Sequence, residues 1–185
     1  MNDTRDGFDY IIVGAGSAGC VLANRLSADP ATRVLLLEAG GADSSFWIRL
    51  PVGYFRTIYD PRYSRLFPTV PCEGTAGRSI VWPRGRIIGG SSSINGLIFI
   101  RGQHADFDDW ADLGAAGWAY RDLLPHFRRI ERYEGGASEY RGADGELAVS
   151  DLLNEHPWCD AWVEAGEQYG LPRNRDFNAE TTLGV

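Results

Sequence analysis

The chain has 185 residues, of which 44% are apolar and 23% charged, enough for a globular domain with a hydrophobic core. Its 18 basic and 25 acidic residues give a formal net charge of −7, which excludes the positive surface that nucleic acids and anionic membranes attract. No apolar run approaches the roughly 20 residues of a membrane-spanning helix, and three widely spaced cysteines predict neither a disulfide framework nor a zinc site.

The first forty residues predict a strand, a helix and a second strand. Short β-branched apolar runs at Phe8–Val13 and Arg33–Glu38 are typical of buried parallel strands. Between them, Ser17–Ser27 has helical spacing and ends before Pro30, which cannot continue a helix. Strand, helix and strand within about 30 residues form a βαβ unit with a right-handed crossover, so the predicted fold class is α/β.

The character of the sequence changes after Gly41. Residues 42–85 are rich in Pro, Gly and aromatic residues and predict an extended excursion with short strands near Thr69–Val70 and Ser79–Trp82. The later patterns predict helices over Asp106–Leu113, Tyr120–Tyr133 and Pro157–Tyr169 and a strand over Gly145–Val149. Only two strands of a parallel sheet are predicted, and two strands cannot cover both faces of such a sheet, so we expect an incomplete fold.

A glycine-rich turn, Gly14-Ala15-Gly16-Ser17-Ala18-Gly19, joins the first predicted strand to the helix. Gly14 permits a tight turn, Gly16 lets the backbone approach a pyrophosphate, and Gly19 lets helix and strand pack closely. The start of the helix then directs unpaired N–H groups and a positive dipole end at the phosphates.

Glu38 closes the second predicted strand, where its carboxylate can accept hydrogen bonds from both ribose hydroxyls of an adenosine. An acid there disfavours the extra phosphate of NADP. The alternative, a tight turn beside an exposed Glu, explains neither the third glycine nor the acid. The pattern therefore predicts a dinucleotide site, without distinguishing NAD from FAD.

A second glycine-rich stretch, Gly89-Gly90-Ser91-Ser92-Ser93-Ile94-Asn95-Gly96, favours FAD. The glycine pair offers backbone that can lie against a flat ring, and the serines add N–H and hydroxyl donors for anionic or polyol groups. Asn95 can both donate and accept at the mixed edge of a ring. The alternative is a flexible Gly/Ser linker, but Ile87-Ile88 and Leu97–Ile100 flank the stretch with apolar residues and predict that it is buried.

The stretch from Gly85 to Asn95, followed by Phe99, Gly102 and Asp108, resembles the first signature of the GMC (glucose–methanol–choline) flavin oxidoreductases, especially the choline and aliphatic alcohol dehydrogenase branch. The resemblance extends over essentially the whole chain. It implies an incomplete, Rossmann-like FAD-binding domain of an oxidoreductase that acts on the CH–OH group of a primary alcohol. The implied division is a dinucleotide-binding unit over 1–41, an excursion with a flavin-contacting loop over 42–110, and a segment over 111–185 leading into a largely missing substrate domain.

The resemblance also implies the residues that bind FAD. Adenosine would lie at Glu38 and Ala39, and pyrophosphate over the turn from Gly14 to Gly19. The ribityl chain and isoalloxazine would be lined from the signature by Arg86, Ile87, Gly90, Ser91, Asn95, Gly96, Leu97 and Ile98. Some family members carry a His immediately before the Asn, covalently joined to the flavin. Here Ile94 stands in that position, so we expect non-covalently bound FAD.

No catalytic residue is predicted in this chain. The family handles the substrate proton with a late His, paired with another His or an Asn, in a portion absent here. His104, His126 and His156 lie in no motif that the resemblance marks as catalytic, so we expect the 185-residue chain alone not to oxidise an alcohol. Two alternatives remain: a flavoprotein of the same fold with lyase or photodecarboxylase chemistry, and a non-catalytic fragment or split half that needs a partner chain.

The expected partner is a small-molecule alcohol, with no nucleic acid, no transmembrane segment and no metal. The sequence assigns neither the electron acceptor nor the oligomeric state. Its cysteine usage fits a reducing compartment, so we expect a cytoplasmic protein or one peripheral to the inner face of a membrane.

Overall fold

The computed structural model describes residues 7–152 and 156–185. The chain divides between Ile98 and Phe99 into two compact units, here called the N-terminal unit and the C-terminal unit. None of the helices in the described ranges is both long enough and apolar enough to cross a membrane.

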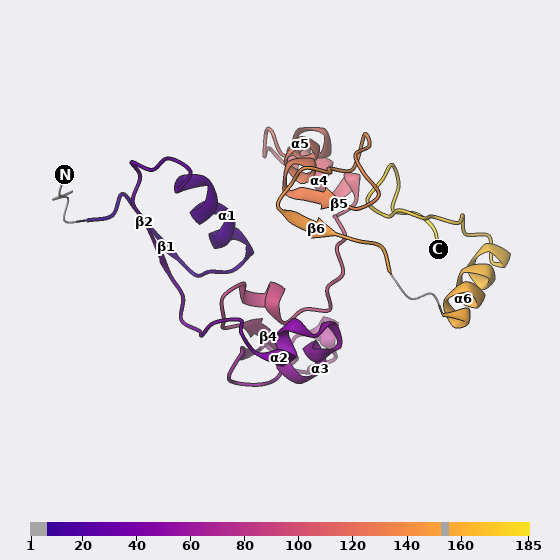
Figure 1. Cartoon of the computed structure of the whole chain (residues 1–185). Coiled ribbons are helices and arrows are strands. Elements are labelled where there is room, and N and C mark those ends of the chain that lie inside the picture. The colour runs from indigo at the N-terminus through magenta and orange to yellow at the C-terminus, as the bar shows by residue number, and fades with distance from the viewer. Residues whose placement is uncertain (1–6, 153–155) are drawn as a thin grey trace. The chain divides into compact units, whose positions relative to one another are not determined.

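The N-terminal unit begins with the predicted strand, helix and strand (Figure 1). These elements are β1 (Tyr10–Val13), α1 (Ser17–Leu26) and β2 (Val34–Leu37). The two strands pair in parallel from Tyr10↔Val34 to Val13↔Leu37. Local apolar runs and the glycine turn between strand and helix were enough to predict this βαβ unit, and its predicted boundaries are correct to within two residues.

The prediction that both strands are buried is wrong for this chain. Ile12 is buried, but its neighbours Ile11 and Val13 are 62% and 83% exposed. A parallel sheet usually has covered faces, which is why its strands are apolar throughout. Two strands and α1 provide too little surface to cover these residues, so the strand sequences suit a larger sheet than this chain contains.

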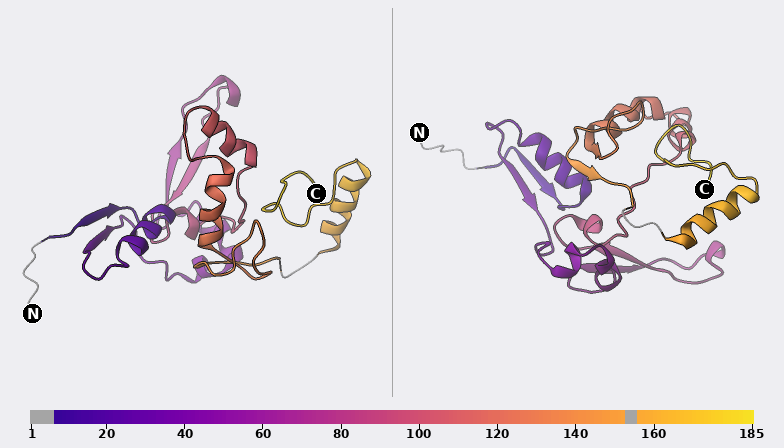
Figure 2. Two further views of the ribbon diagram at one scale, coloured as in Figure 1. Left: turned by 90° about the horizontal axis from the view of Figure 1, so that it is seen from above. Right: turned by 45° about the vertical axis from the view of Figure 1, so that its right-hand side comes forward.

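Residues 42–85 form short helical turns and a long hairpin (Figure 2). The elements are α2 (Phe46–Arg49), η1 (Pro51–Gly53), α3 (Tyr54–Thr57), β3 (Ser64–Pro68), η2 (Glu73–Thr75) and β4 (Val81–Gly85). The helical turns were missed because three or four residues are too few to show an apolar repeat.

The strand predicted near Thr69–Val70 is wrong: β3 lies earlier and pairs antiparallel with β4, which overlaps the second predicted strand. Both faces of the hairpin are largely exposed, so β3 shows no apolar alternation.

The C-terminal unit contains α4 (His104–Asp112), α5 (Tyr120–Ile130), β5 (Glu131–Tyr133), β6 (Leu147–Val149) and α6 (Pro157–Gln168). The three predicted helices are present, and the strand predicted over Gly145–Val149 is present as β6. The helix predicted to reach Tyr133 instead ends at Ile130, because Glu131 is extended and begins β5, which pairs in parallel with β6. This strand depends on a partner sixteen residues away and had no local signal.

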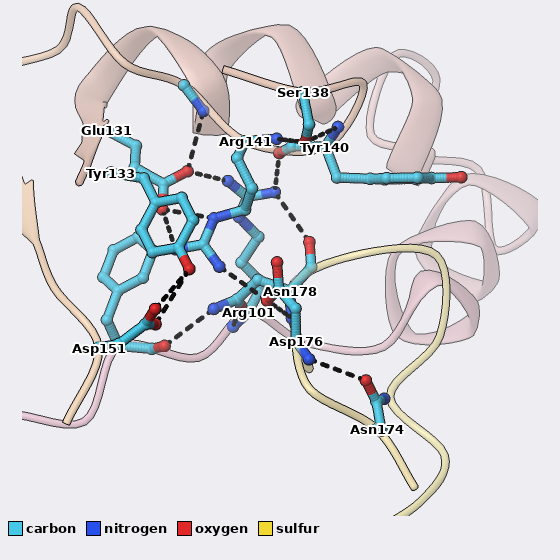
Figure 3. A network of polar contacts seen from close by, with 12 residues as sticks. Arg101, Glu131, Tyr133, Ser138, Tyr140, Arg141, Asp151, Asn174, Asp176 and Asn178 are labelled. Carbon is cyan, nitrogen blue, oxygen red and sulfur yellow. Dashed lines mark hydrogen bonds and ion pairs between the residues drawn. The ribbon is translucent and has the colours of Figure 1, made fainter. Parts of the chain in front are cut away.

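A buried carboxylate network stabilises the C-terminal unit (Figure 3). Glu131 is fully buried; its Oε2 lies 2.7 Å from Arg101 Nη2 and its Oε1 lies 2.6 Å from Arg141 Nη2. Arg141 Nη1 also reaches Asp176 Oδ1 at 2.7 Å. Two guanidinium groups against two carboxylates keep the cluster neutral, which burial of charge requires. Glu131, the first residue of β5, thus anchors the segment that follows α5.

Candidate functional site

The glycine turn between β1 and α1 has the geometry that its sequence predicts. Gly14 has a φ of 97°, a conformation that favours glycine. A Cβ at Gly19 would overlap the carbonyl group of Gly14, so only glycine permits this close packing of helix and strand. No side chain caps the start of α1, and its first turn contains no acid. The N–H groups around Ser17 and Ala18 are therefore free to bind an anion.

Glu38 follows β2 and is held against the glycine turn. Its Oε2 accepts a hydrogen bond from the Ala15 N–H at 2.8 Å, and its Oε1 accepts one from the Gly40 N–H at 2.8 Å. Each oxygen retains a lone pair for a further donor. The sequence predicted the ribose-binding role of Glu38 but not its bond to Ala15, which joins residues 23 positions apart.

The glycine-rich stretch of residues 89–96, here called the double-glycine loop, contains η3 (Gly90–Ser93). This loop packs directly on the glycine turn. The Gly89 N–H donates to the Ala15 carbonyl at 2.7 Å. A Cβ at Gly90, whose φ is 57°, would lie only 2.8 Å from the Cα of Gly16. The structure thus brings the glycine turn, the acid and the double-glycine loop together.

The serines of this loop divide into two kinds. Ser92 Oγ donates to the Gly89 carbonyl at 2.6 Å, and Ser93 Oγ donates to the Ile88 carbonyl at 2.7 Å. Ser91 Oγ instead accepts the Gly85 N–H at 3.1 Å and keeps its own proton for another acceptor. Two of the three hydroxyl donors that the sequence offered are therefore used to shape the loop.

The apolar residues around the loop do not all bury it as predicted. Ile87 and Ile94 are buried, and the Ile87 carbonyl accepts a hydrogen bond from the Gly90 N–H at 2.7 Å. By contrast, Leu97 and Ile98 are mostly exposed, with Ile98 at 81%. The expectation that the segment from Leu97 onward clamps the loop is wrong, because the Leu97 and Ile98 side chains are exposed.

Asn95 and Gly96 connect the loop to these exposed residues. Asn95 Oδ1 accepts the Leu97 N–H at 3.0 Å, which leaves the amide N–H groups of Asn95 as donors. Leu97 has a φ of 60°, uncommon for a residue with a side chain. These residues adjoin η3 in sequence but do not line the cavity beside Glu38.

That cavity has a volume of about 510 Å³, within the usual range for small-molecule sites. One side is formed by the ends of β1 and β2, from Val13, Gly14, Leu37, Glu38 and Ala39. The other side includes Gly85 and Arg86 and continues onto the β3–β4 hairpin. Gly14, Glu38, Ala39 and Arg86, all predicted from the sequence to bind the cofactor, therefore line one space.

Three further lining residues, Arg65, Phe67 and Arg84, were not predicted from the sequence. The sequence does contain one indication of these residues. Arg65 and Phe67 are two positions apart, as are Trp82 and Arg84, so each pair lies on one face of a strand. Without knowing which strands pair, this spacing does not indicate a shared site.

The histidines have structural surroundings, and all three lie in the C-terminal unit. The His104 ring stacks on Tyr120 with 3.5 Å between centroids. His156 Nδ1 accepts the Trp158 N–H at 3.2 Å and caps α6, and His126 is exposed on α5. Across the described ranges, no three His, Cys, Asp or Glu side chains form a group that could hold a metal ion.

Comparison with known proteins gives concordant matches. A profile of the family described as GMC oxidoreductase matches residues 8–185. The oxygen-dependent choline dehydrogenase of Photobacterium profundum is 46% identical over 180 residues, which cover 96% of this chain and 31% of that protein. The alcohol dehydrogenase (acceptor) of Pseudomonas putida is 45% identical over 179 residues, covering 96% and 32%. The chain thus spans about a third of the length of the curated relatives it matches.

A solved structure extends this likeness to the fold. The crystal structure of pyridoxine 4-oxidase from Mesorbium loti superposes with a TM-score of 0.86 at 39% identity, over 94% of this chain and 34% of that one. This match confirms the predicted α/β, Rossmann-like class, present here as part of a larger fold. Sequence profile, relatives and fold agree over nearly every residue, and the chain belongs to the GMC oxidoreductase family.

Proposed function

We propose that this chain forms the FAD-binding part of an oxidoreductase that acts on the CH–OH group of a primary alcohol. The observation that carries the proposal is that the glycine turn contacts both Glu38 and the double-glycine loop, while Gly14 and Glu38 line one cavity. The relatives named choline dehydrogenase and alcohol dehydrogenase support the reaction class.

In this proposal, separate segments of the chain bind successive parts of the cofactor. Glu38 and Ala39 bind the adenosine ribose, and the free N–H groups at the start of α1 bind the pyrophosphate. The loop from Arg86 to Ser91 and the segment from Asn95 to Ile98 orient the ribityl chain and flavin. When bound, FAD supplies the acceptor for a hydride from the carbinol carbon.

The cofactor is held without a covalent bond in this proposal. Ile94, at the position where some relatives carry the flavin-linked His, is a buried aliphatic residue and has no nucleophilic atom. Residues 1–41 serve as the dinucleotide-binding unit, 42–110 carry the flavin-contacting loop, and 111–185 lead toward the substrate domain.

This part of the protein binds and positions rather than moving the substrate proton. The cavity that we assign to FAD is lined by residues of the N-terminal unit, and the sequence of that unit contains no histidine. We therefore expect the 185-residue chain alone to be inactive toward alcohols.

The absorbance spectrum of the full-length gene product tests the proposal. We expect oxidised-flavin bands that a primary alcohol bleaches in the absence of oxygen. Denaturation followed by filtration should release all the flavin as intact FAD. A protein that stays colourless when supplied with FAD would refute the proposed cofactor, and a bound flavin that no alcohol reduces would refute the reaction.

A further inference from the structure

The β3–β4 hairpin presents an unusual face. Its antiparallel register places Arg65 directly opposite Arg84 and Phe67 directly opposite Trp82. Residues directly opposite in such a pair project to the same face, as do residues two apart along one strand. One face of the hairpin therefore carries two guanidinium groups and two aromatic rings.

The two arginines lack the acidic partner that such an arrangement requires. Like charges directly opposite in a sheet are destabilising. Within the described parts of the chain, no carboxylate lies within ion-pair distance of Arg65 or Arg84. Arg84 Nη1 donates a hydrogen bond to the neighbouring carbonyl of Pro83 at 3.0 Å. An anion from outside the chain would relieve this repulsion.

Each guanidinium group lies over an aromatic ring of its own strand. Arg65 Cζ is 5.6 Å from the centroid of the Phe67 ring, and Arg84 Cζ is 4.8 Å from that of the Trp82 ring. A cation held over a ring is already partly ordered, so less conformational entropy is lost when it binds an anion.

This face is turned toward the proposed cofactor site. Arg65, Phe67 and Arg84 line the cavity of about 510 Å³, whose other side carries Glu38 and the apolar end of β1 at Val13. One wall thus offers an acceptor for ribose hydroxyls, and the facing wall offers positive charge and an aromatic ring.

We propose that Arg65, Phe67 and Arg84 form the second wall of the site for the purine nucleoside diphosphate half of the dinucleotide. Phe67 contacts the purine, since every base has a face that packs on an aromatic ring. Arg65 and Arg84 neutralise the pyrophosphate, in addition to the N–H groups at the start of α1. This inference rests on the proposed function and adds binding residues to it.

Ligand titrations of the cofactor-free full-length gene product test the inference. The ligands are FAD, ADP and FMN; ADP lacks the flavin and FMN lacks the adenosine half. We expect Arg65→Gln, Arg84→Gln and Phe67→Ala each to weaken FAD and ADP binding about tenfold or more, since a charge-assisted contact or a stacked ring is lost. FMN keeps one of the two phosphates but lacks the purine, so FMN binding should stay unchanged in Phe67→Ala.

Arg78→Gln is the matched control, because it removes one positive charge from the loop of the same hairpin without touching the cavity. It should leave the affinities for FAD and ADP unchanged. Unchanged ADP binding in the three cavity variants, in a wild-type protein that binds FAD, would overturn this inference and leave the proposed function intact. A wild-type protein that binds neither FAD nor ADP would overturn both.

The salt dependence of wild-type ADP binding provides a test that needs no variant. Arginines that neutralise a pyrophosphate make the affinity fall as salt rises, because screening weakens exposed charge pairs. We expect a clear fall between roughly 50 and 500 mM salt. An affinity that salt does not change would overturn the inference even if the variants failed to fold.

Discussion

Gly40 and Gly41 are adjacent, but substitution by Ala should have opposite effects on the stability of the protein at these two positions. A Cβ at Gly40 would overlap the backbone carbonyl of Arg86, whereas a Cβ at Gly41 would have no atom within 4 Å. Overpacking against backbone that cannot rotate away costs about 1–3 kcal/mol, so Gly40→Ala should destabilise the protein. Gly41→Ala, in open space, should stabilise it by about 0.4–1 kcal/mol through the unfolded chain.

The two variants should therefore differ by about 1.5–4 kcal/mol in the free energy of unfolding. Chemical denaturation of the full-length gene product measures this difference. FAD affinity should fall in Gly40→Ala alone, because moving Arg86 separates Glu38 from the double-glycine loop. Equal stability and equal FAD affinity of the two variants would show that the end of β2 and the segment at Arg86 do not approach as closely as the structure has them.

Three further substitutions test separate features of the structure. Glu38→Gln should weaken FAD binding about tenfold or more in a fluorescence titration, because an amide nitrogen cannot accept the hydrogen bond that the lost carboxylate oxygen accepted; unchanged affinity would refute the ribose-binding role. Glu131→Gln should lower the free energy of unfolding by about 3–5 kcal/mol, since it leaves buried guanidinium charge unpaired, whereas Glu139→Gln on the surface should change it by less than about 0.5 kcal/mol. The Thr75 hydroxyl holds the pKa of the exposed Cys72 thiol below its usual value, so Thr75→Val should raise that pKa and slow iodoacetamide alkylation of Cys72 at neutral pH, as mass spectrometry of the peptide would show; an equal rate would refute the hydrogen bond.

The errors in the sequence predictions share one physical origin. Local sequence pattern predicts a strand near Thr69–Val70 and a helix that ends at Tyr133. Both were decided instead by pairing with distant strands, β4 in one case and β6 in the other. Burial of Val13 and Ile98 was inferred from their apolar character, but burial depends on how much surrounding chain is available to cover them, and this chain spans about a third of its relatives.

The local sequence was sufficient to predict the βαβ unit, the glycine turn and the family. Glycine conformation and the alternation of strand and helix depend on neighbouring residues alone. It was also sufficient to place an acid at the end of β2. The approach of Gly90 to Gly16, the bond from Ala15 to Glu38 and the facing of the hairpin toward that acid could be found only in the folded chain. Each depends on contacts between segments more than twenty residues apart, whose partners no local pattern specifies.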